Sequence, residues 1–381
     1  MSNKKKVAIL GCTGSIGTSA LDVMRKYKDE LELYSATAHS STDELKKIAA
    51  EFSPRFIAVS NKSRKADCDF GNVKTGFGAE ALKEACSGAD IVVMAIVGMA
   101  ALPPFVYCLE NDIPVALANK ESMVCGARLI RDLMDERGSV VLPVDSETFA
   151  ISECLRGRNK ADVSSVLLTA SGGPFRTWKK EDIDEATPDM ALRHPNWSMG
   201  AKITVDCATM LNKGLEVMET RWLFDIEPAC IRIVVHPESI IHSMVEYNDN
   251  AVIAHMAVSD MRLPIANALL YPNVPKVAVD KLDLFSIGSL HFEEPSRDRF
   301  PCLDLAYEAI KKEGALPIVL NSSNEIAVGR FLAGEFPLRG IAELIESAMC
   351  RFGGESVSSF EDIYALDREV RKFVVSVKIR R

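Results

Sequence analysis

Three polar side chains of one predicted helix have the types and spacing of a binding site. Asn212 and Glu216 are four residues apart and Lys213 and Glu216 are three apart, so all three share one helical face. Such a lysine binds an anion, and such a glutamate binds a cation or moves a proton. An ordinary solvated face with a Lys–Glu pair fits the same pattern. The opposite face is apolar and comprises Leu211, Leu215, Met218 and Trp222.

A second candidate, Asp145 and Glu147, follows the predicted buried strand Val140–Val144. The two side chains share a face if the strand end is extended. Two carboxylates held together bind a cation or raise the pKa of one of them, whereas a helix cap explains Asp145 alone. The polar cluster Ala118–Ser122 follows the predicted strand Val115–Leu117 in the same way. Ligands of open α/β sheets bind beyond such strand ends.

The N-terminal segment has the order of a dinucleotide-binding unit. A strand over Lys5–Leu10 leads into the glycine-rich turn Gly11–Gly17, and a helix over Thr18–Lys26 follows. The glycines let the backbone approach a pyrophosphate at the helix N-terminus; a tight strand-to-helix turn that binds no ligand is the alternative. After the next strand, Leu31–Ala36, the stretch Thr37–Thr42 has no acid for a ribose 2′-hydroxyl, which favours NADP over NAD.

Two loops carry further polar groups. Ser171 with two glycines follows the predicted strand Ser164–Thr169 and is a candidate anion nest; an ordinary turn, which uses the same residue types, is the alternative. The loop His194–Gly200 contains Trp197, whose size predicts a lid that closes over bound ligand; packing on the domain surface is the alternative. The alternation in Lys202–Val205 predicts a short strand, and Asp206 then occupies an N-cap position.

In the second half of the chain, predicted strands are followed by predicted helices. A strand over Ile231–Val235 and a hairpin of Ile240–Tyr247 with Ala251–Val258 are expected, with His242 as a structural residue. The chain is irregular from about Tyr271 to Phe300, which indicates a linker. Helices are then expected at Leu303–Lys312, Leu316–Leu332, Leu338–Met349 and Asp367–Val375, as in a small bundle.

Composition bounds the class of protein. The chain has 381 residues and a net charge of −8, which argues against nucleic-acid and membrane-surface partners. Its ten cysteines have no metal-ligand spacing and indicate reduced thiols in a cytoplasmic protein. The uncharged run Ile91–Leu109 holds Pro103 and Pro104, so a buried strand, a turn and a helix with prolines in its first turn are expected rather than a membrane span.

The motifs, in this order, resemble those of the 1-deoxy-D-xylulose 5-phosphate reductoisomerase family: GCTGSIG, ANKES, PVDSE, LTASGGPF, HPNWSMG, ATMLNKGLE and HPESIIHSM. The resemblance runs through nearly the whole chain and is weakest in its C-terminal helices. It implies an α/β fold with an N-terminal Rossmann-like NADP-binding domain, a connective α/β catalytic domain and a C-terminal α-helical bundle. The corresponding residues are 1–145, 146–270 and 297–381, with a linker over 271–296. A cytoplasmic homodimer is also implied.

The resemblance implies a role for each matching residue. Catalytic roles fall to Lys120, Asp145, Glu147, Glu216 and His194, and Mg²⁺ or Mn²⁺ is bound by Asp145, Glu147 and Glu216. A phosphorylated ketose is bound by Lys120, Ser146, Glu147, Ser171, His194, Trp197, Cys207, Asn212, Lys213 and Glu216. NADPH is bound by Thr13, Gly14, Ser15, Ile16, His39, Ser40, Ser41, Asn119, Glu121 and Gly200.

Two stretches depart from the family pattern. Cys207 stands where the family usually has a serine that contacts the substrate phosphate, and a thiol is a weaker hydrogen-bond donor. His39, Ser40 and Ser41 replace a stretch that often carries a basic residue, which weakens the expected recognition of the 2′-phosphate.

The implied reaction is the rearrangement of 1-deoxy-D-xylulose 5-phosphate and its reduction to 2-C-methyl-D-erythritol 4-phosphate, in the non-mevalonate isoprenoid pathway. Fragmentation with recombination and a direct acyl shift are both compatible with these residues. Two other functions are alternatives. A semialdehyde-type dehydrogenase needs a cysteine nucleophile in a catalytic turn, and a nucleotide sensor has no use for the three carboxylates.

Overall fold

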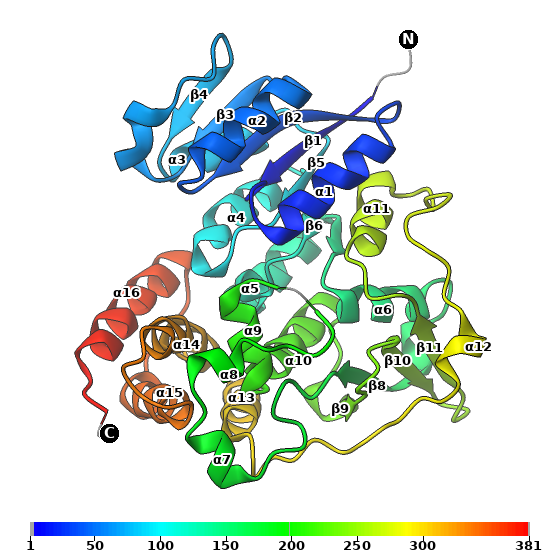
Figure 1. The fold of residues 1–381 in the computed structure, drawn as a ribbon, viewed down its shortest axis with the longest axis vertical. Coiled ribbons are helices and arrows are strands. Elements are labelled where there is room, and N and C mark those ends of the chain that lie inside the picture. Colours follow the sequence, from blue (N-terminus) through cyan, green and yellow to red (C-terminus); the bar gives the residue numbers. More distant parts are fainter. Residues whose placement is uncertain (1–3, 198, 380–381) are drawn as a thin grey trace. The chain divides into compact units, whose positions relative to one another are not determined.

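The computed structural model describes residues 4–197 and 199–379 (Figure 1). It divides into two compact units. The first comprises the chain up to Ser122, Asp132–Phe149 and Asp260–Asp280, and the second comprises Met123–Arg131, Ala150–Ser259 and the chain from Lys281 onward. The predicted division into a cofactor domain, a connective domain, a linker and a helical bundle is not tested by these two units and stays a prediction.

The first unit is built on a seven-stranded sheet whose neighbouring strands are all parallel, which confirms the predicted Rossmann-like fold. Buried apolar side chains dominate the inner strands of this sheet, as expected for a sheet covered on both faces, whereas the outer strands β4 and β7 are largely half-buried. The short, glycine-containing β4 was not predicted. The strand order is β4 (Lys74–Phe77), β3 (Phe56–Val59), β2 (Leu31–Ala38), β1 (Lys5–Leu10), β5 (Ile91–Met94), β6 (Val115–Leu117) and β7 (Val141–Pro143).

Helices connect these strands. The charge-free run forms β5, a 3₁₀ turn and α4, whose first turn holds the prolines as predicted. Within the described residues, no helix is both long and apolar enough to cross a membrane. Apolar side chains of α11, among them Leu269, pack into the core around β1, although α11 is far from β1 in the sequence. The elements are α1 (Ser15–Lys26), α2 (Thr42–Phe52), η1 (Lys62–Asp67), α3 (Glu80–Cys86), η2 (Gly98–Ala101), α4 (Leu102–Glu110) and α11 (Arg262–Leu270).

The second unit contains a four-stranded sheet in the order β11–β10–β8–β9. Strands β8 (Val163–Ala170) and β9 (Ile231–Val235) are parallel, and the predicted hairpin pairs β10 (Ile241–Tyr247) with β11 (Val252–Met256). Strand β11 is an edge strand, and alternate residues on it are exposed. His242 is buried on β10, with its Nε2 atom 3.3 Å from the Ala257 carbonyl oxygen, consistent with the predicted structural role.

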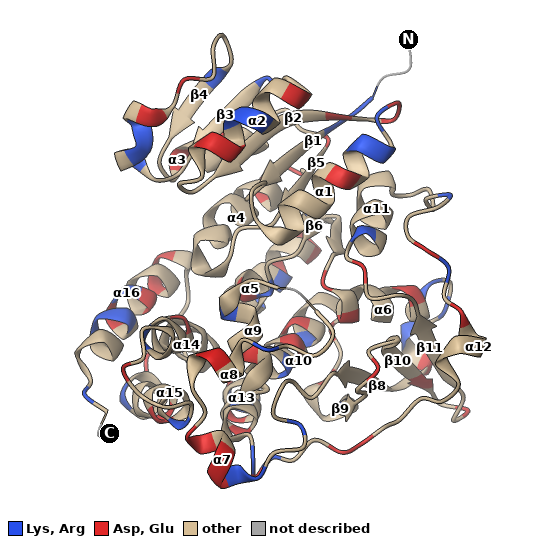
Figure 2. Ribbon diagram, in the orientation of Figure 1, with Lys and Arg blue, Asp and Glu red and all other residues tan. Residues whose placement is uncertain are grey.

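The remaining helices belong wholly or partly to the second unit. Helix α5 is kinked at Ala127 and, like α6, contributes residues to both units. Four helices form the predicted C-terminal bundle, and α16 carries both acidic and basic residues (Figure 2). The bounds are α5 (Lys120–Arg137), α6 (Ser146–Leu155), η3 (Lys160–Asp162), α7 (Lys180–Asp184), α8 (Pro188–Ala191), α9 (Ala201–Ala208), α10 (Leu211–Phe224), η4 (Pro228–Cys230), α12 (Leu284–Ile287), α13 (Pro301–Lys312), α14 (Leu316–Leu332), α15 (Arg339–Phe352) and α16 (Phe360–Ser376).

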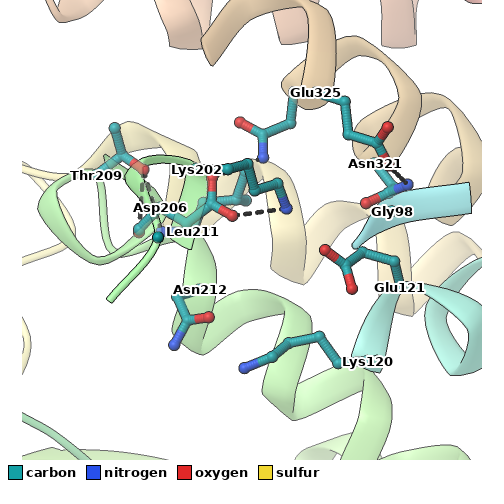
Figure 3. Close-up of polar contacts among 12 residues, drawn as sticks. Gly98, Lys120, Glu121, Lys202, Asp206, Thr209, Leu211, Asn212, Asn321 and Glu325 are labelled. Carbon is teal, nitrogen blue, oxygen red and sulfur yellow. Dashed lines mark hydrogen bonds and ion pairs between the residues drawn. The ribbon is translucent and has the colours of Figure 1, made fainter. Parts of the chain in front are cut away.

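The segment around Asp206 differs from the prediction. Lys202–Val205 lies in helix α9 rather than in a strand, and Asp206 is inside that helix rather than at an N-cap. The Asp206 side chain is 1% exposed, and its carboxylate lies 2.7 Å from Lys202 Nζ (Figure 3). It also accepts a hydrogen bond of 2.8 Å from Asn324 Nδ2 on α14. This carboxylate therefore joins α9 to the C-terminal bundle.

Removing the Asp206 carboxylate should strongly destabilise the protein. We expect Asp206→Ala to lower the free energy of unfolding by about 3 kcal/mol, because it removes the carboxylate that accepts from the buried Asn324 amide and pairs with the partly buried Lys202 ammonium. Urea unfolding followed by circular dichroism measures this. Asp182→Ala, at an exposed position of α7, is the matched control. Equal losses for the two variants would contradict the importance of this contact.

The half-buried His255 on β11 should make stability depend on pH. Burial and the neighbouring His242 lower the pKa of His255 from 6.5 to about 4. Between these values the unfolded chain binds a proton that the folded chain does not, so stability is full above pH 6.5 and falls as the pH drops towards 4. We expect a loss of about 1–2 kcal/mol over this window, since the ring keeps some solvent contact. His255→Gln should flatten the pH dependence of urea unfolding, and an unchanged slope would refute the assignment.

Candidate functional site

The glycine-rich turn between β1 and α1 has the geometry of a pyrophosphate site. Gly11 has a φ of +90°, and a Cβ atom there would lie 2.6 Å from the carbonyl oxygen of Ala95. A Cβ atom on Gly17 would collide with the Gly11 carbonyl. Gly14 is exposed, and no described side chain caps the helix or places an acid in its first turn. The first backbone N–H groups of α1 therefore have no side-chain cap among the described residues, an arrangement suited to anion binding.

The residues assigned to this site lie around the turn and beyond β2. Thr13 and Ile16 are half-buried, and Ser15 is exposed. Past β2, His39 Nδ1 lies 2.9 Å from Ser60 Oγ, and Asn61 Nδ2 donates to Ser40 Oγ over 3.0 Å. Ser41 occupies the N-cap position of α2. The end of β2 thus offers imidazole and hydroxyl groups and no carboxylate, as the sequence predicted.

A polar cluster begins helix α5. Asn119 caps the helix, because its Oδ1 atom accepts the Ser122 N–H over 2.9 Å. Its Nδ2 atom donates to Glu121 Oε2 over 2.9 Å. The Lys120 ammonium lies 3.0 Å from Asp145 Oδ2, and both side chains are largely buried. The ends of β6 and β7, which neighbour each other in the sheet, thus bring together two of the predicted catalytic residues.

Asp145 and Glu147 do not share an extended strand end, contrary to the prediction. Asp145 directly precedes α6 and its carbonyl accepts the Phe149 N–H, while Glu147 lies in the first turn of that helix. Ser146 Oγ donates to Glu147 Oε2 over 2.5 Å. Both carboxylates therefore lie at the start of a helix, where the helix dipole stabilises negative charge.

In the second unit, Asn212, Lys213 and Glu216 converge as their spacing predicted. The Asn212 amide and the Lys213 ammonium both donate to the Glu216 carboxylate. Helix α10 is buried almost throughout, and Glu216 is only 1% exposed. The alternative of a solvated helix face is therefore wrong. A carboxylate this buried is stable because two adjacent groups donate to it.

The predicted anion nest brings Ser171 to His194. Two backbone N–H groups, of Asn196 and Trp197, donate to His194 Nδ1, so this atom carries no proton. The proton of the neutral ring therefore lies on Nε2, 3.1 Å from Ser171 Oγ. That oxygen also accepts the Gly173 N–H. With its two acceptor sites used, the Ser171 hydroxyl is left to act as a donor, as an anion requires.

The other loop residues lie close by. The Trp197 ring is half-buried, with its centroid 6.3 Å from that of His242. Gly200 is the N-cap of α9, and Cys207 lies near the end of the same helix. The predicted lid, His194–Gly200, includes Ser198, which lies outside the described residues; its movement stays a prediction.

Asn196 was not among the predicted site residues, although its side chain makes two contacts across the second unit. A signal was present in the sequence: an amide side chain stands between a histidine and a tryptophan of one loop, in a stretch too long for a tight turn.

Comparison with family models identifies this arrangement. A 1-deoxy-D-xylulose 5-phosphate reductoisomerase model matches residues 7–127. Models of the reductoisomerase C-terminal domain match residues 141–224 and 256–373. The reductoisomerase of Thermoanaerobacter pseudethanolicus is 44% identical, over 99% of this chain and 100% of its own length. That of Clostridium tetani is also 44% identical, over 97% and 98%.

Solved structures agree with these relatives. The Zymomonas mobilis reductoisomerase in complex with NADPH is 38% identical, with a TM-score of 0.90 over 98% of this chain and 100% of its own. A reductoisomerase in complex with NADPH, fosmidomycin and magnesium is 37% identical, with a TM-score of 0.92 over 98% of both chains. By its sequence over nearly its full length, and by its fold, this chain belongs to the 1-deoxy-D-xylulose 5-phosphate reductoisomerase family.

Proposed function

We propose that this chain converts 1-deoxy-D-xylulose 5-phosphate to 2-C-methyl-D-erythritol 4-phosphate, with NADPH as the reductant and Mg²⁺ or Mn²⁺ as the metal. The observation that carries the proposal is the pair of carboxylates, Asp145 and Glu147, positioned beside Lys120 at the sheet edge of a reductoisomerase-family chain. A semialdehyde dehydrogenase or a nucleotide sensor has no need of this pair.

The metal ligands of the proposal are Asp145 and Glu147 from the first unit and Glu216 from the second. Carboxylate oxygens are the ligands that hard divalent cations prefer. Lys120 and Ser146 already hold Asp145 and Glu147 through hydrogen bonds, which orients their oxygens and reduces the entropy lost on binding. Glu216 is held in the same way by donors on its own helix. Three carboxylates also offset the charge of a cation.

The substrate phosphate is assigned to donors of the second unit. Ser171 supplies its hydroxyl, because His194 and Gly173 occupy its acceptor sites. Asn212 and Lys213 add an amide and an ammonium group. Cys207 contributes a weaker donor than a serine would. Binding the phosphate at one end positions the reacting end of the sugar, which lowers the barrier of the chemical step.

NADPH is assigned to the first unit. The turn Gly11–Gly17 holds the pyrophosphate against the start of α1. His39 and the two serines after it accommodate the 2′-phosphate by hydrogen bonds. When bound, the metal would polarise the adjacent hydroxyl and carbonyl oxygens of the ketose, and NADPH would supply the hydride that reduces the rearranged aldehyde.

The function is tested by following NADPH absorbance with 1-deoxy-D-xylulose 5-phosphate, in the presence of Mg²⁺ or Mn²⁺ and after chelation. We expect oxidation only when ketose phosphate and metal are both present, and a higher kcat/KM with NADPH than with NADH. The absence of turnover under all of these conditions would refute the proposed reaction. Equal or better turnover with NADH would refute the cofactor preference alone.

Replacing one metal ligand should separate metal chemistry from cofactor binding. We expect Glu147→Gln to lower kcat by at least about 100-fold, because an amide donates no charge to a cation. NADPH affinity, measured by fluorescence titration, should remain nearly unchanged. Glu153→Gln, on the same helix and paired with Arg156, is the matched control. Wild-type activity of the Glu147 variant would remove this residue from the metal site.

The proposal includes a homodimer formed through the second unit. Strand β11 is an edge, and Val252 and Met256 are exposed on it. The apolar side chains of Leu284 and Phe285, the latter 99% exposed, lie on α12 of the linker. An edge strand and exposed apolar groups of this kind are covered when a second copy of the chain binds.

Negative charges introduced on β11 and α12 should dissociate the proposed dimer. We expect the double variant Val252→Asp and Phe285→Asp to sediment as a monomer at a concentration at which the unaltered chain is a dimer, because each carboxylate would be desolvated at the interface. Val274→Asp, on an exposed residue of the first unit, should remain dimeric. Analytical ultracentrifugation distinguishes the species, and a dimeric double variant would place the interface elsewhere.

A cytoplasmic location is also proposed. None of the ten cysteines forms a disulfide bond in the structure, and reduced thiols persist in a reducing compartment.

A further inference from the structure

The side chain of Asn196 bridges from its loop to a separate turn of the second unit. Its Nδ2 atom donates to the carbonyl oxygen of Pro237 over 2.6 Å and to Ser239 Oγ over 2.8 Å. The turn that receives these bonds connects β9 to β10 and is more than forty residues away in sequence. One amide group therefore uses both of its hydrogens to hold the loop in place.

The receiving turn is itself firmly held. His236 is fully buried; its Nε2 atom accepts the Ile240 N–H over 3.2 Å, so its Nδ1 atom carries the proton and donates to the His291 carbonyl over 2.9 Å. Ser239 has a φ of +53°, and its backbone N–H donates to the His236 carbonyl over 3.1 Å. Ser259 Oγ donates to the Ser239 carbonyl. The acceptors for Asn196 are thus fixed by contacts on both sides.

Within the loop, Asn196 stands between two residues of the proposed site. Its own backbone N–H and that of Trp197 both donate to His194 Nδ1. The same His194 ring directs its Nε2 atom to Ser171 Oγ. Fixing the Asn196 side chain therefore fixes the backbone that sets the His194 ring, and it limits where the Trp197 ring can lie.

We propose that Asn196 is a positioning residue for the reaction. Its amide ties the loop to the Pro237–Ser239 turn and so orients His194 towards Ser171 and keeps Trp197 beside His242. It acts through these neighbours, while the hydroxyl of Ser171, which His194 orients, is the proposed donor to the phosphate. This inference rests on the proposed function for its kinetic effect and on the loop contacts alone for its structural effect.

Three substitutions distinguish a positioning role of Asn196 from that of an ordinary exposed amide. Asn196→Asp keeps the size of the side chain but replaces two donors by an acceptor that faces the Pro237 carbonyl oxygen. Asn196→Gln keeps the donors on a longer stem. Ser239→Ala removes one of the two acceptors and leaves the other. The expected order of damage is therefore Asn196→Asp first, then Ser239→Ala, with Asn196→Gln retaining part of the wild-type behaviour.

The kinetic arm compares these variants with Asn273→Asp, which makes the same charge change at an exposed residue of the first unit. We expect Asn196→Asp to raise KM for 1-deoxy-D-xylulose 5-phosphate by at least about fivefold, the fold-change typical of a lost hydrogen bond. KM for NADPH should stay within twofold, and kcat should fall less than KM rises. Asn273→Asp should match the unaltered enzyme.

The spectroscopic arm uses ¹⁹F NMR of protein labelled with 5-fluorotryptophan. The chain has three tryptophans, and Trp197→Phe assigns the signal of Trp197. We expect Asn196→Asp to shift or broaden that signal and to leave those of Trp178 and Trp222 in place. A general loss of structure would instead move all three.

The proposal is overturned if Asn196→Asp matches Asn273→Asp both in KM for the ketose phosphate and in the Trp197 signal. An effect on KM for NADPH as large as that on KM for the ketose phosphate would also overturn it, since that pattern indicates a general structural role. If the unaltered chain does not turn over the ketose phosphate, the proposed reaction fails, and the Trp197 signal alone decides whether Asn196 positions the loop.

Discussion

Charged groups buried within helices α9 and α10 constrain the whole second unit. A carboxylate without water is stable only beside donors, so Glu216 requires Lys213 and Asn212, and Asp206 requires Lys202 and Asn324. Three of these donors come from the same helix as their acceptor, whereas Asn324 comes from the C-terminal bundle. The bundle therefore completes the polar interior on which the proposed phosphate donors rest, although it supplies none of those donors itself.

Local patterns were sufficient for most of the fold. The buried part of β1 and the whole of β5 are continuous apolar runs, and α15 carries its buried apolar residues at helical spacing. The failures have physical causes. Four alternating residues, Lys202–Val205, are too few to distinguish a strand from one turn of a helix. Strand β4 is short and half-exposed, so it lacks the apolar run of a central strand.

The spacing of the candidate site residues was predicted better than their environment. Spacing alone placed Asn212, Lys213 and Glu216 on one face, but no helical pattern distinguishes a solvated polar face from a buried one whose charges neutralise each other. The proton arrangement of His194 depends on backbone N–H groups two and three residues later, which the sequence does not reveal. The contacts of Asn196 depend on a turn that is distant in sequence, so only the folded chain brings them together.

In the proposed dimer, the outer position of β11 sets how two copies of the chain meet. An edge strand presents a row of backbone groups that pair with any strand of matching length. If two copies meet across a twofold axis, each covers the edge of the other and growth ends at two chains. If they meet by translation, each addition leaves a new edge and growth continues. The symmetry of this one contact, more than the net charge of the surface, therefore separates a closed assembly from a fibre.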